Sequence, residues 1–287
     1  MPSLVGSEMC IRDRYDTIKK YTDRYMKQVN LLPNIITAFG LSCGLYIIFK
    51  VNLLSPDTSL FQVLLGSAIL LLIAAIADVL DGAVARAIRA ETEFGFSFDS
   101  LADAITFGVV PSVLLLKSLS LEQGSPLAFL CITGAMFYSI CGVLRLARFN
   151  ISQHITPTKT SLLYKKSFIG LPIPAAALAG VSANLFLMSP IVQDRFSISL
   201  HYRTIFLTTI MVVLGFLMIS HIYFPSLKTL HMRSTSFSVV FVTGIVAIFL
   251  LYGLLHHFPI LFIAISWGYI VFSLILFCFR KQKAHKN

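Results

Sequence analysis

Long apolar runs, each near 20 residues and separated by short polar segments, dominate the pattern of this chain. A helix of about 20 apolar residues spans a bilayer, whereas a transmembrane barrel needs short strands of alternating polarity. The runs are continuous, so the pattern predicts an all-α protein, a polytopic membrane helix bundle of about eight transmembrane helices. The expected helices cover residues 35–54, 60–87, 95–118, 126–149, 170–190, 204–225, 236–254 and 259–279.

The segments around these helices divide the chain into four parts. Residues 1–14 resemble a translated sequencing adapter and lack the apolar centre of a signal peptide, so we expect this tail to be non-native. Residues 15–32 are expected to form a basic, amphipathic surface helix beside the membrane. One membrane domain is expected over 33–225, and 226–287 would add two C-terminal transmembrane helices and a basic tail.

Composition supports a membrane protein and excludes nucleic acid as a partner. Only 13% of the residues are charged and 56% are hydrophobic, whereas soluble domains have about 25% charged residues. The net charge is +10, but the basic residues cluster at the ends of apolar runs, without the aromatic alternation of a nucleic-acid surface. Such clusters are typical of loops that meet anionic lipid headgroups, so membrane lipids are the expected surroundings.

The basic residues also predict an orientation. If the N-terminus lies in the cytoplasm and eight helices alternate, most of the 23 Lys and Arg residues fall on the cytoplasmic side. The exceptions are Lys50, Lys117, Arg195 and Arg203. Because cytoplasmic loops are enriched in Lys and Arg, the pattern predicts that both termini and the polar stretch 78–103 face the cytoplasm.

Four aspartates lie between two apolar runs, two closing the 60–87 helix and two opening the 95–118 helix. They are Asp78 and Asp81, three apart, and Asp99 and Asp103, four apart. Each pair shares a helix face, and the short connection 88–94 makes the two helices antiparallel neighbours. Converging carboxylates repel one another unless cations lie between them, so we expect Mg²⁺ or Mn²⁺, with two ions about 4 Å apart suiting transfer of a phosphorus group.

Small residues and one arginine accompany the aspartates. Gly82, Ala85 and Gly95 leave space where a bulky ligand can approach the helices. Arg86 can make paired hydrogen bonds to phosphate oxygens. A single aspartate at a helix end is usually a solvated surface charge, but four at helical spacing near membrane depth indicate function.

Glycines and prolines inside the expected helices have two interpretations. Gly40 and Gly44 are four apart in the first helix, a spacing that favours close helix packing over ligand binding. Pro111, Pro172 and Pro174 either break their helices to shape a cavity or only kink them.

The motif Asp78-x2-Asp81-Gly82-x2-Ala85-Arg86-x8-Gly95-x3-Asp99-x3-Asp103 resembles, without a departure, the signature of the CDP-alcohol phosphatidyltransferases. Other segments resemble the bacterial branch of this family that uses L-serine. They are "PNIITAFGLSCG" (33–44), "FDSLADAITFGVVPS" (98–112), "RLARFN" (145–150) and "FIGLPIPAAA" (168–177). The resemblance spans about 33–177, and the family domain is accordingly assigned to 33–225.

The resemblance implies a role for each matching position. Asp78, Asp81 and Asp99 would bind two divalent metal ions, and Asp103 would be the general base and a further metal ligand. The positions near the cytidine and diphosphate of the donor are Gly82, Ala85, Arg86 and Gly95. The implied reaction transfers the phosphatidyl group of CDP-diacylglycerol to L-serine, releasing CMP and leaving phosphatidylserine.

The acceptor site is expected at the end of the fourth helix. Arg145 and Arg148 would hold a phosphate or the serine carboxylate. Asn150, Ser100 or a backbone carbonyl would accept from the serine ammonium, unless Asn150 only caps the helix end. The same arginines have a topological explanation, because basic residues often end a helix on the cytoplasmic side. The family implies a homodimer in the bacterial cytoplasmic (inner) membrane.

Two alternatives stay open at this stage. The chemistry could be retained with another acceptor: glycerol 3-phosphate, inositol or choline. A cation-coupled transporter would instead use the acidic cluster as an ion path. Transporter sites usually lie near the membrane midplane between repeated halves, whereas this cluster lies near one face and no repeat stands out.

Overall fold

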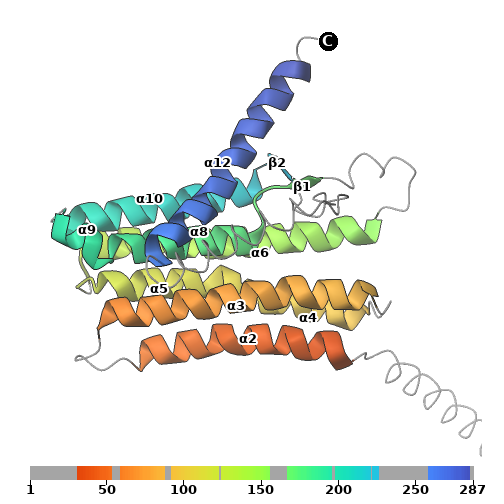
Figure 1. The fold of residues 1–287 in the computed structure, drawn as a ribbon, viewed down its shortest axis with the longest axis horizontal. Coiled ribbons are helices and arrows are strands. Elements are labelled where there is room, and N and C mark those ends of the chain that lie inside the picture. The colour runs from red at the N-terminus through yellow and green to blue at the C-terminus, as the bar shows by residue number, and fades with distance from the viewer. Residues whose placement is uncertain are drawn as a thin grey trace, which may run out of the picture.

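The structure is a computed structural model that describes residues 31–53, 59–87, 92–122, 124–155, 167–195, 198–220, 222–225 and 258–284. Most helices lie along one common direction, and α12 crosses the others obliquely (Figure 1). The helices are α2 (Leu31–Asn52), α3 (Leu60–Ala87), α4 (Glu93–Asp103), the π-helix η1 (Ala104–Val109), α5 (Val110–Leu119), α6 (Pro126–Ile155), α8 (Ile173–Leu187), α9 (Pro190–Arg195), α10 (Leu200–Ile219) and α12 (Phe258–Ala284). The strands are β1 (Ser167–Ile169) and β2 (Tyr223–Pro225).

The helices confirm a multi-pass membrane protein of the helical class. Within the described residues, six segments are long and apolar enough to span a bilayer, and α8 is a shorter apolar helix of 15 residues. The six segments are Pro33–Asn52, Leu60–Ala85, Glu93–Leu119, Pro126–Ile151, Leu200–Ile219 and Phe258–Phe277. The adapter-like tail at 1–14, the surface helix expected at 15–32 and the transmembrane helix expected at 236–254 lie outside the described residues.

Two expected helices are shorter than their apolar runs because a small antiparallel ladder intervenes. Strand β1 pairs with β2, and Phe168 lies opposite Phe224. The expected helix 204–225 therefore ends at Ile219. The helix expected at 170–190 begins only at Ile173, because Gly170 adopts φ +83° and Pro172 is extended. A side chain at position 170 would also meet the backbone of α10, which leaves glycine as the residue that fits.

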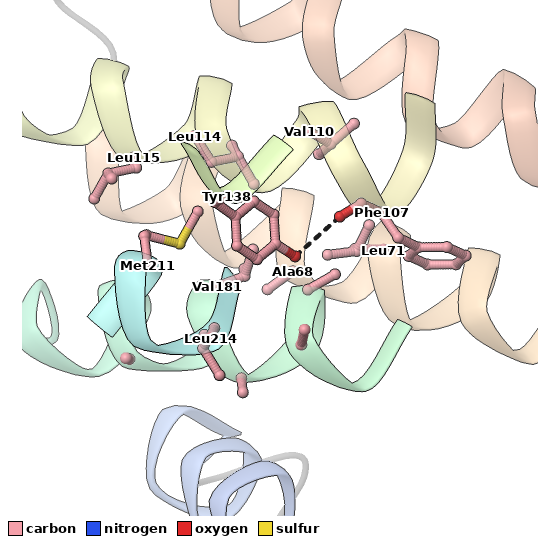
Figure 2. Packing of buried hydrophobic residues seen from close by; sticks show 14 of the residues in the cluster. Ala68, Leu71, Phe107, Val110, Leu114, Leu115, Tyr138, Val181, Met211 and Leu214 are labelled. Carbon is pink, nitrogen blue, oxygen red and sulfur yellow. Dashed lines mark hydrogen bonds between the residues drawn. The ribbon is translucent and has the colours of Figure 1, made fainter. Parts of the chain in front are cut away.

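A hydrophobic core joins α3, α5, α6, α8 and α10 (Figure 2). Leu71 of α3, Leu114 of α5 and Leu214 of α10 are all fully buried in it. Between helices in a membrane, close packing rather than water exclusion supplies much of the attraction. Gly134 of α6 illustrates this, because a Cβ there would lie 2.5 Å from Cγ2 of Thr208 on α10.

The outer surface is apolar, as expected for contact with lipid. Large side chains such as Phe129 of α6 and Phe216 of α10 are 75% and 66% exposed. The polar functional residues instead gather at one end of the bundle. There α2 begins, α3 ends, α4 begins and α6 ends (Figure 1). Helix α2 contacts both α3 and α4, so it holds the two aspartate-bearing helices together.

Candidate active site

A cleft at this end of the bundle contains all four aspartates of the sequence motif. Asp78 and Asp81 come from the last turns of α3, and Asp99 and Asp103 come from α4. The cleft encloses about 220 Å³ of empty space when its open mouth is included. The other lining residues are Thr37, Gly40 and Leu41 of α2, Ala74 of α3, Ala102 of α4, and Thr106 and Phe107 of η1. The expected convergence of the carboxylates is therefore confirmed, with α2 as a wall that the sequence analysis did not assign.

Local signals explain how α4 presents its two aspartates. Thr92 has extended backbone angles, and its hydroxyl accepts a hydrogen bond of 3.0 Å from the Gly95 amide, as an N-cap does. Asp99 and Asp103 then follow at a spacing of one turn and face the cleft together. Ala102, which lies between them in the sequence, is buried and also lines the cleft.

Gly95 provides a close approach between two parts of the protein. A Cβ on Gly95 would lie 3.0 Å from the Thr92 hydroxyl and 3.1 Å from Oδ1 of Asn34. The missing side chain therefore lets the start of α4 approach the start of α2. Asn34 belongs to "PNIIT" (33–37), a segment that the sequence analysis connected with the serine branch without giving it a role.

Three carboxylates have the arrangement of a metal-binding cluster. One oxygen from each of Asp78, Asp99 and Asp103 lies within 4.8 Å of the other two, and all three side chains are partly buried. Carboxylate oxygens are the ligands that hard divalent cations prefer. Without a cation between them, three converging negative charges in a partly buried cleft would repel one another. The donor set therefore fits a divalent metal ion.

Asp81 lies in the same cleft, but one of its oxygens is directed to α2. Its side chain is 4% exposed, and Oδ2 accepts a hydrogen bond of 2.6 Å from the hydroxyl of Thr37. A short hydrogen bond to a buried carboxylate restrains its orientation. Sequence reasoning missed Thr37 because it lies on a different helix from the aspartate that it contacts.

Helix α6 carries two arginines near its end, Arg145 and Arg148, which have different surroundings. Arg145 is partly buried, and its charge acts on Asp103 and Asp78. Its Nε atom is buried without a hydrogen-bond partner among the described residues. Arg148 lies one turn further along, where Nη1 donates a hydrogen bond of 3.1 Å to the carbonyl of Ile219 at the end of α10. Both arginines therefore come from the end of α6, and Arg148 has a direct bond to the end of α10.

The remaining predicted site residues surround the cleft. Gly82 and Ala85 are partly buried on the last turns of α3. Arg86 belongs to α3, but its side chain lies outside the described part of the structure. Asn150 accepts a hydrogen bond of 3.1 Å from the hydroxyl of Ser100, which connects the end of α6 to α4 between the two aspartates.

The chain as a whole matches a known family. Residues 30–240 match the family model of the CDP-alcohol phosphatidyltransferases. This match covers well over half of the chain, so the protein belongs to the CDP-alcohol phosphatidyltransferase family, as its motif indicated.

Similar proteins within this family share one name. A CDP-diacylglycerol–serine O-phosphatidyltransferase of Helicobacter pylori (strain ATCC 700392 / 26695) is 33% identical over 262 residues, which cover 88% of this chain and 97% of that protein. The protein of that name from Bacillus subtilis (strain 168) is 34% identical over 200 residues, 70% of this chain and 93% of its own. The one from Methanocaldococcus jannaschii is 34% identical over 175 residues, 61% and 71% of the two chains.

Proposed function

We propose that this protein transfers the phosphatidyl group of CDP-diacylglycerol to the hydroxyl of L-serine, giving phosphatidylserine and CMP in phospholipid biosynthesis. The observation that carries the proposal is the convergence of Asp78, Asp99 and Asp103 in one cleft at the end of a membrane helix bundle. The shared name of the similar proteins supports serine as the acceptor. A cleft at a membrane edge also suits one lipid substrate and one water-soluble substrate.

Divalent metal is part of the proposal. Asp78, Asp81, Asp99 and Asp103 would together hold two ions, either Mg²⁺ or Mn²⁺. Bound metal would supply positive charge against the diphosphate of the donor, which makes CMP a better leaving group. The Thr37 hydroxyl restrains Asp81 for this role through its hydrogen bond.

Asp103 is the proposed general base. It takes the proton of the serine hydroxyl as that oxygen forms a bond to the phosphatidyl phosphorus. The bond between this phosphorus and the CMP oxygen breaks, and CMP leaves with the electron pair. In the proposal, the positive charge of Arg145 and the bound metal ions together would favour the carboxylate form of Asp103 that a base needs.

Donor and acceptor occupy different sides of the cleft in this proposal. Gly82, Ala85, Arg86 and Gly95 lie near the cytidine and diphosphate of CDP-diacylglycerol. On the α6 side, the serine carboxylate pairs with Arg145 or Arg148. Both arginines have a buried nitrogen without a hydrogen-bond partner among the described residues, Nε of Arg145 and Nη2 of Arg148. We favour Arg145, because Nη1 of Arg148 is bonded to the Ile219 carbonyl. Asn150 and Ser100, which bond to each other, offer oxygen atoms to the serine ammonium.

The distribution of Lys and Arg supports a proposal for the membrane placement. We infer a bacterial cytoplasmic (inner) membrane location, with both termini and the cleft on the cytoplasmic side. Lys50 and Lys117, which the charge pattern assigned to the other side, end α2 and α5, far from the aspartates. A membrane-impermeant thiol reagent would label Glu93→Cys only in inside-out vesicles and Leu53→Cys only in right-side-out vesicles, after Cys10 and Cys278 are replaced by serine. Labelling of both variants from the same side contradicts the inference.

The proposal also covers the domain boundaries and the oligomeric state of the protein. The catalytic domain would comprise 33–225, with 226–287 as an additional pair of transmembrane helices and a basic tail. The protein would work as a homodimer, which light scattering of the purified protein in detergent, corrected for the micelle, would measure. A monomeric mass at full activity contradicts the dimer and leaves the reaction intact.

An acceptor panel tests the proposed reaction. Purified protein would receive CDP-diacylglycerol, Mg²⁺ or Mn²⁺, and one acceptor at a time, with CMP and the lipid product both measured. We expect rapid turnover with L-serine and little with inositol or choline. Choline would be better served by an aromatic cage than by arginines. Turnover with glycerol 3-phosphate and none with serine would overturn the acceptor while leaving phosphatidyl transfer in place.

A further inference from the structure

The helix that carries Asp99 and Asp103 contains a π-helical turn directly after Asp103. Residues 104–109 form η1, and the amide of Val110 closes the turn on the carbonyl of Ile105, five residues back. A π-turn inserts about one extra residue into a helix, and such turns occur often at functional sites. One residue corresponds to a rotation of about 100° around the helix axis. The turn therefore sets how α4 and α5 are rotated relative to each other.

The rotation at η1 allows α5 to face the core while α4 directs its aspartates into the cleft. Helix α5 places Val110, Leu114 and Leu115 in the core, where each is at most 2% exposed. Helix α4 places Asp99 and Asp103 in the cleft. If an uninterrupted α-helix kept α5 in the core, the two aspartates would turn away from their present direction by about 100°.

Pro111 gives the sequence reason for the turn. Proline has no amide hydrogen, and its ring clashes with the carbonyl four residues earlier in an α-helix. That carbonyl belongs to Phe107, which lies in η1. The Phe107 carbonyl accepts a hydrogen bond of 3.0 Å from the hydroxyl of Tyr138 on α6 (Figure 2). Tyr138 is fully buried, so its hydroxyl replaces the donor that Pro111 lacks.

The next residues on each helix continue the contact. The hydroxyl of Ser139 lies 2.9 Å from the carbonyl of Gly108 and 2.9 Å from the hydroxyl of Ser112. Ser112 in turn donates to the carbonyl of Ala135, at 3.0 Å. Two adjacent side chains of α6 thus serve two consecutive carbonyls of the π-turn. These bonds connect the turn to the helix that also carries Arg145.

The opposite side of the π-turn rests on α2. Gly44 packs against Thr106, where an added Cβ would lie 2.7 Å from the threonine hydroxyl and 3.1 Å from its Cα. The turn is therefore held between α2 on one side and α6 on the other, in agreement with the contacts of η1 to both helices.

We propose that Tyr138 and Ser139 are positioning residues of the transferase, which hold the π-turn and thereby direct Asp99 and Asp103 into the cleft. Neither side chain is among the described residues that line the cleft. Their effect on the reaction passes through the backbone of η1. The inference rests on the proposed function for its catalytic consequence, but its structural part concerns only the orientation of two carboxylates.

The test compares Tyr138→Phe and Ser139→Ala with Ser182→Ala in the full-length protein. Ser182 is a matched control on α8, fully buried, whose hydroxyl donates 2.9 Å to the Ala179 carbonyl away from the cleft. Three quantities would be measured in detergent: Mn²⁺ binding by electron paramagnetic resonance, turnover by CMP release, and the melting temperature. If Tyr138→Phe does not fold, Ser139→Ala carries the comparison.

We expect the Mn²⁺ affinity and the turnover of the two positioning variants each to be about tenfold lower than in wild type. This is the effect of about one lost hydrogen bond. The KM of the acceptor should stay within about twofold of the wild-type value, because neither residue is proposed to touch it. Ser182→Ala should lower only the melting temperature. Wild-type Mn²⁺ binding and turnover in both variants, or equal losses in Ser182→Ala, would overturn the proposal.

A double variant separates the effect of Tyr138 on the orientation of Asp99 and Asp103 from its effect on the stability of the protein. In Tyr138→Phe/Pro111→Ala, the new amide at position 111 can serve the Phe107 carbonyl as in an ordinary α-helix. We expect the melting temperature to recover while Mn²⁺ binding and turnover stay low, because the π-turn becomes an ordinary α-helical turn and α4 rotates relative to α5. Recovery of all three quantities would show that Tyr138 has only a structural role.

The comparison does not depend on the acceptor. Each variant is measured against wild type with whichever acceptor the wild type uses, so failure of serine would overturn the proposed function alone. Equal turnover of wild type and both positioning variants would overturn the positioning role alone.

Discussion

The hydroxyl of Thr37 donates a hydrogen bond of 2.6 Å to Oδ2 of Asp81, joining residues 44 positions apart on α2 and α3. Both side chains are buried, at 7% and 4% exposure. The contact makes α2 part of the candidate active site, although this helix contributes no carboxylate to the motif. It also gives one aspartate of the motif a fixed orientation, whereas Asp78, Asp99 and Asp103 converge on one another.

Thr37→Val tests the importance of this contact. Valine keeps the shape of the side chain but removes the donor, so a buried carboxylate loses a hydrogen bond worth about 1.5–3 kcal/mol. We expect the Mg²⁺ or Mn²⁺ concentration for half-maximal CMP release to rise about tenfold or more. The matched control is Ser42→Ala on the exposed side of α2, whose hydroxyl donates a hydrogen bond of 2.7 Å to the Ala38 carbonyl. An unchanged metal requirement in Thr37→Val would show that the bond does not prepare Asp81 for metal binding.

Asp103→Asn tests the general base. Asparagine keeps the size of the side chain but cannot take the proton of the acceptor hydroxyl, so turnover should fall by about 10²–10⁴-fold. Binding of the CDP-diacylglycerol donor should be largely retained, which separates loss of chemistry from loss of the site.

Asp194→Asn is the control for this substitution, because Asp194 is an exposed residue of α9 outside the cleft. It should release CMP at the wild-type rate. Release at that rate by Asp103→Asn would remove Asp103 from the role of base.

Arg145→Gln tests the acceptor site. The substitution removes the cation proposed to pair with the serine carboxylate, and we expect the KM for serine to rise at least about tenfold. Arg203→Gln is the matched control, since Arg203 lies near the start of α10 and contacts the Ser118 carbonyl and the Met188 sulfur. Equal serine KM values for Arg145→Gln and wild type would move the carboxylate site elsewhere.

Gly44→Ala tests the packing between α2 and η1. The new methyl group would overlap the Thr106 side chain and press on its Cα, so the free energy of unfolding should fall by about 1–3 kcal/mol. Gly268→Ala on α12 is the matched control, because no atom of the described residues lies within 4 Å of its added Cβ. It should be neutral or stabilising, given the higher helix propensity of alanine. Thermal unfolding in detergent measures both, and equal melting temperatures would contradict the close packing of Gly44.

The sequence was sufficient to predict those features that depend on local spacing. Asp99 and Asp103 share a face because they are four residues apart, and the apolar runs define where helices can span a membrane. Contacts between distant segments were not accessible in this way. The bond from Thr37 to Asp81 and the ladder of β1 with β2 each join elements that are far apart along the chain.

The π-turn η1 was partly predictable from the local sequence. Pro111 was predicted to break or kink its helix, and in the structure the π-turn η1 comes directly before the α-helix that contains Pro111. Which consequence follows depends on Tyr138 of α6, because its hydroxyl satisfies the Phe107 carbonyl. Neither that partner nor the resulting rotation of Asp103 can be read from the local sequence.

The most direct test of the account is a stoichiometric assay of the purified protein with CDP-diacylglycerol, isotope-labelled L-serine and Mn²⁺ or Mg²⁺. The account predicts that labelled phosphatidylserine and CMP appear in equal amounts, that a chelator stops both, and that Asp103→Asn forms neither at an appreciable rate. CMP release without labelled lipid, or labelled lipid formed at the wild-type rate by Asp103→Asn, would contradict it.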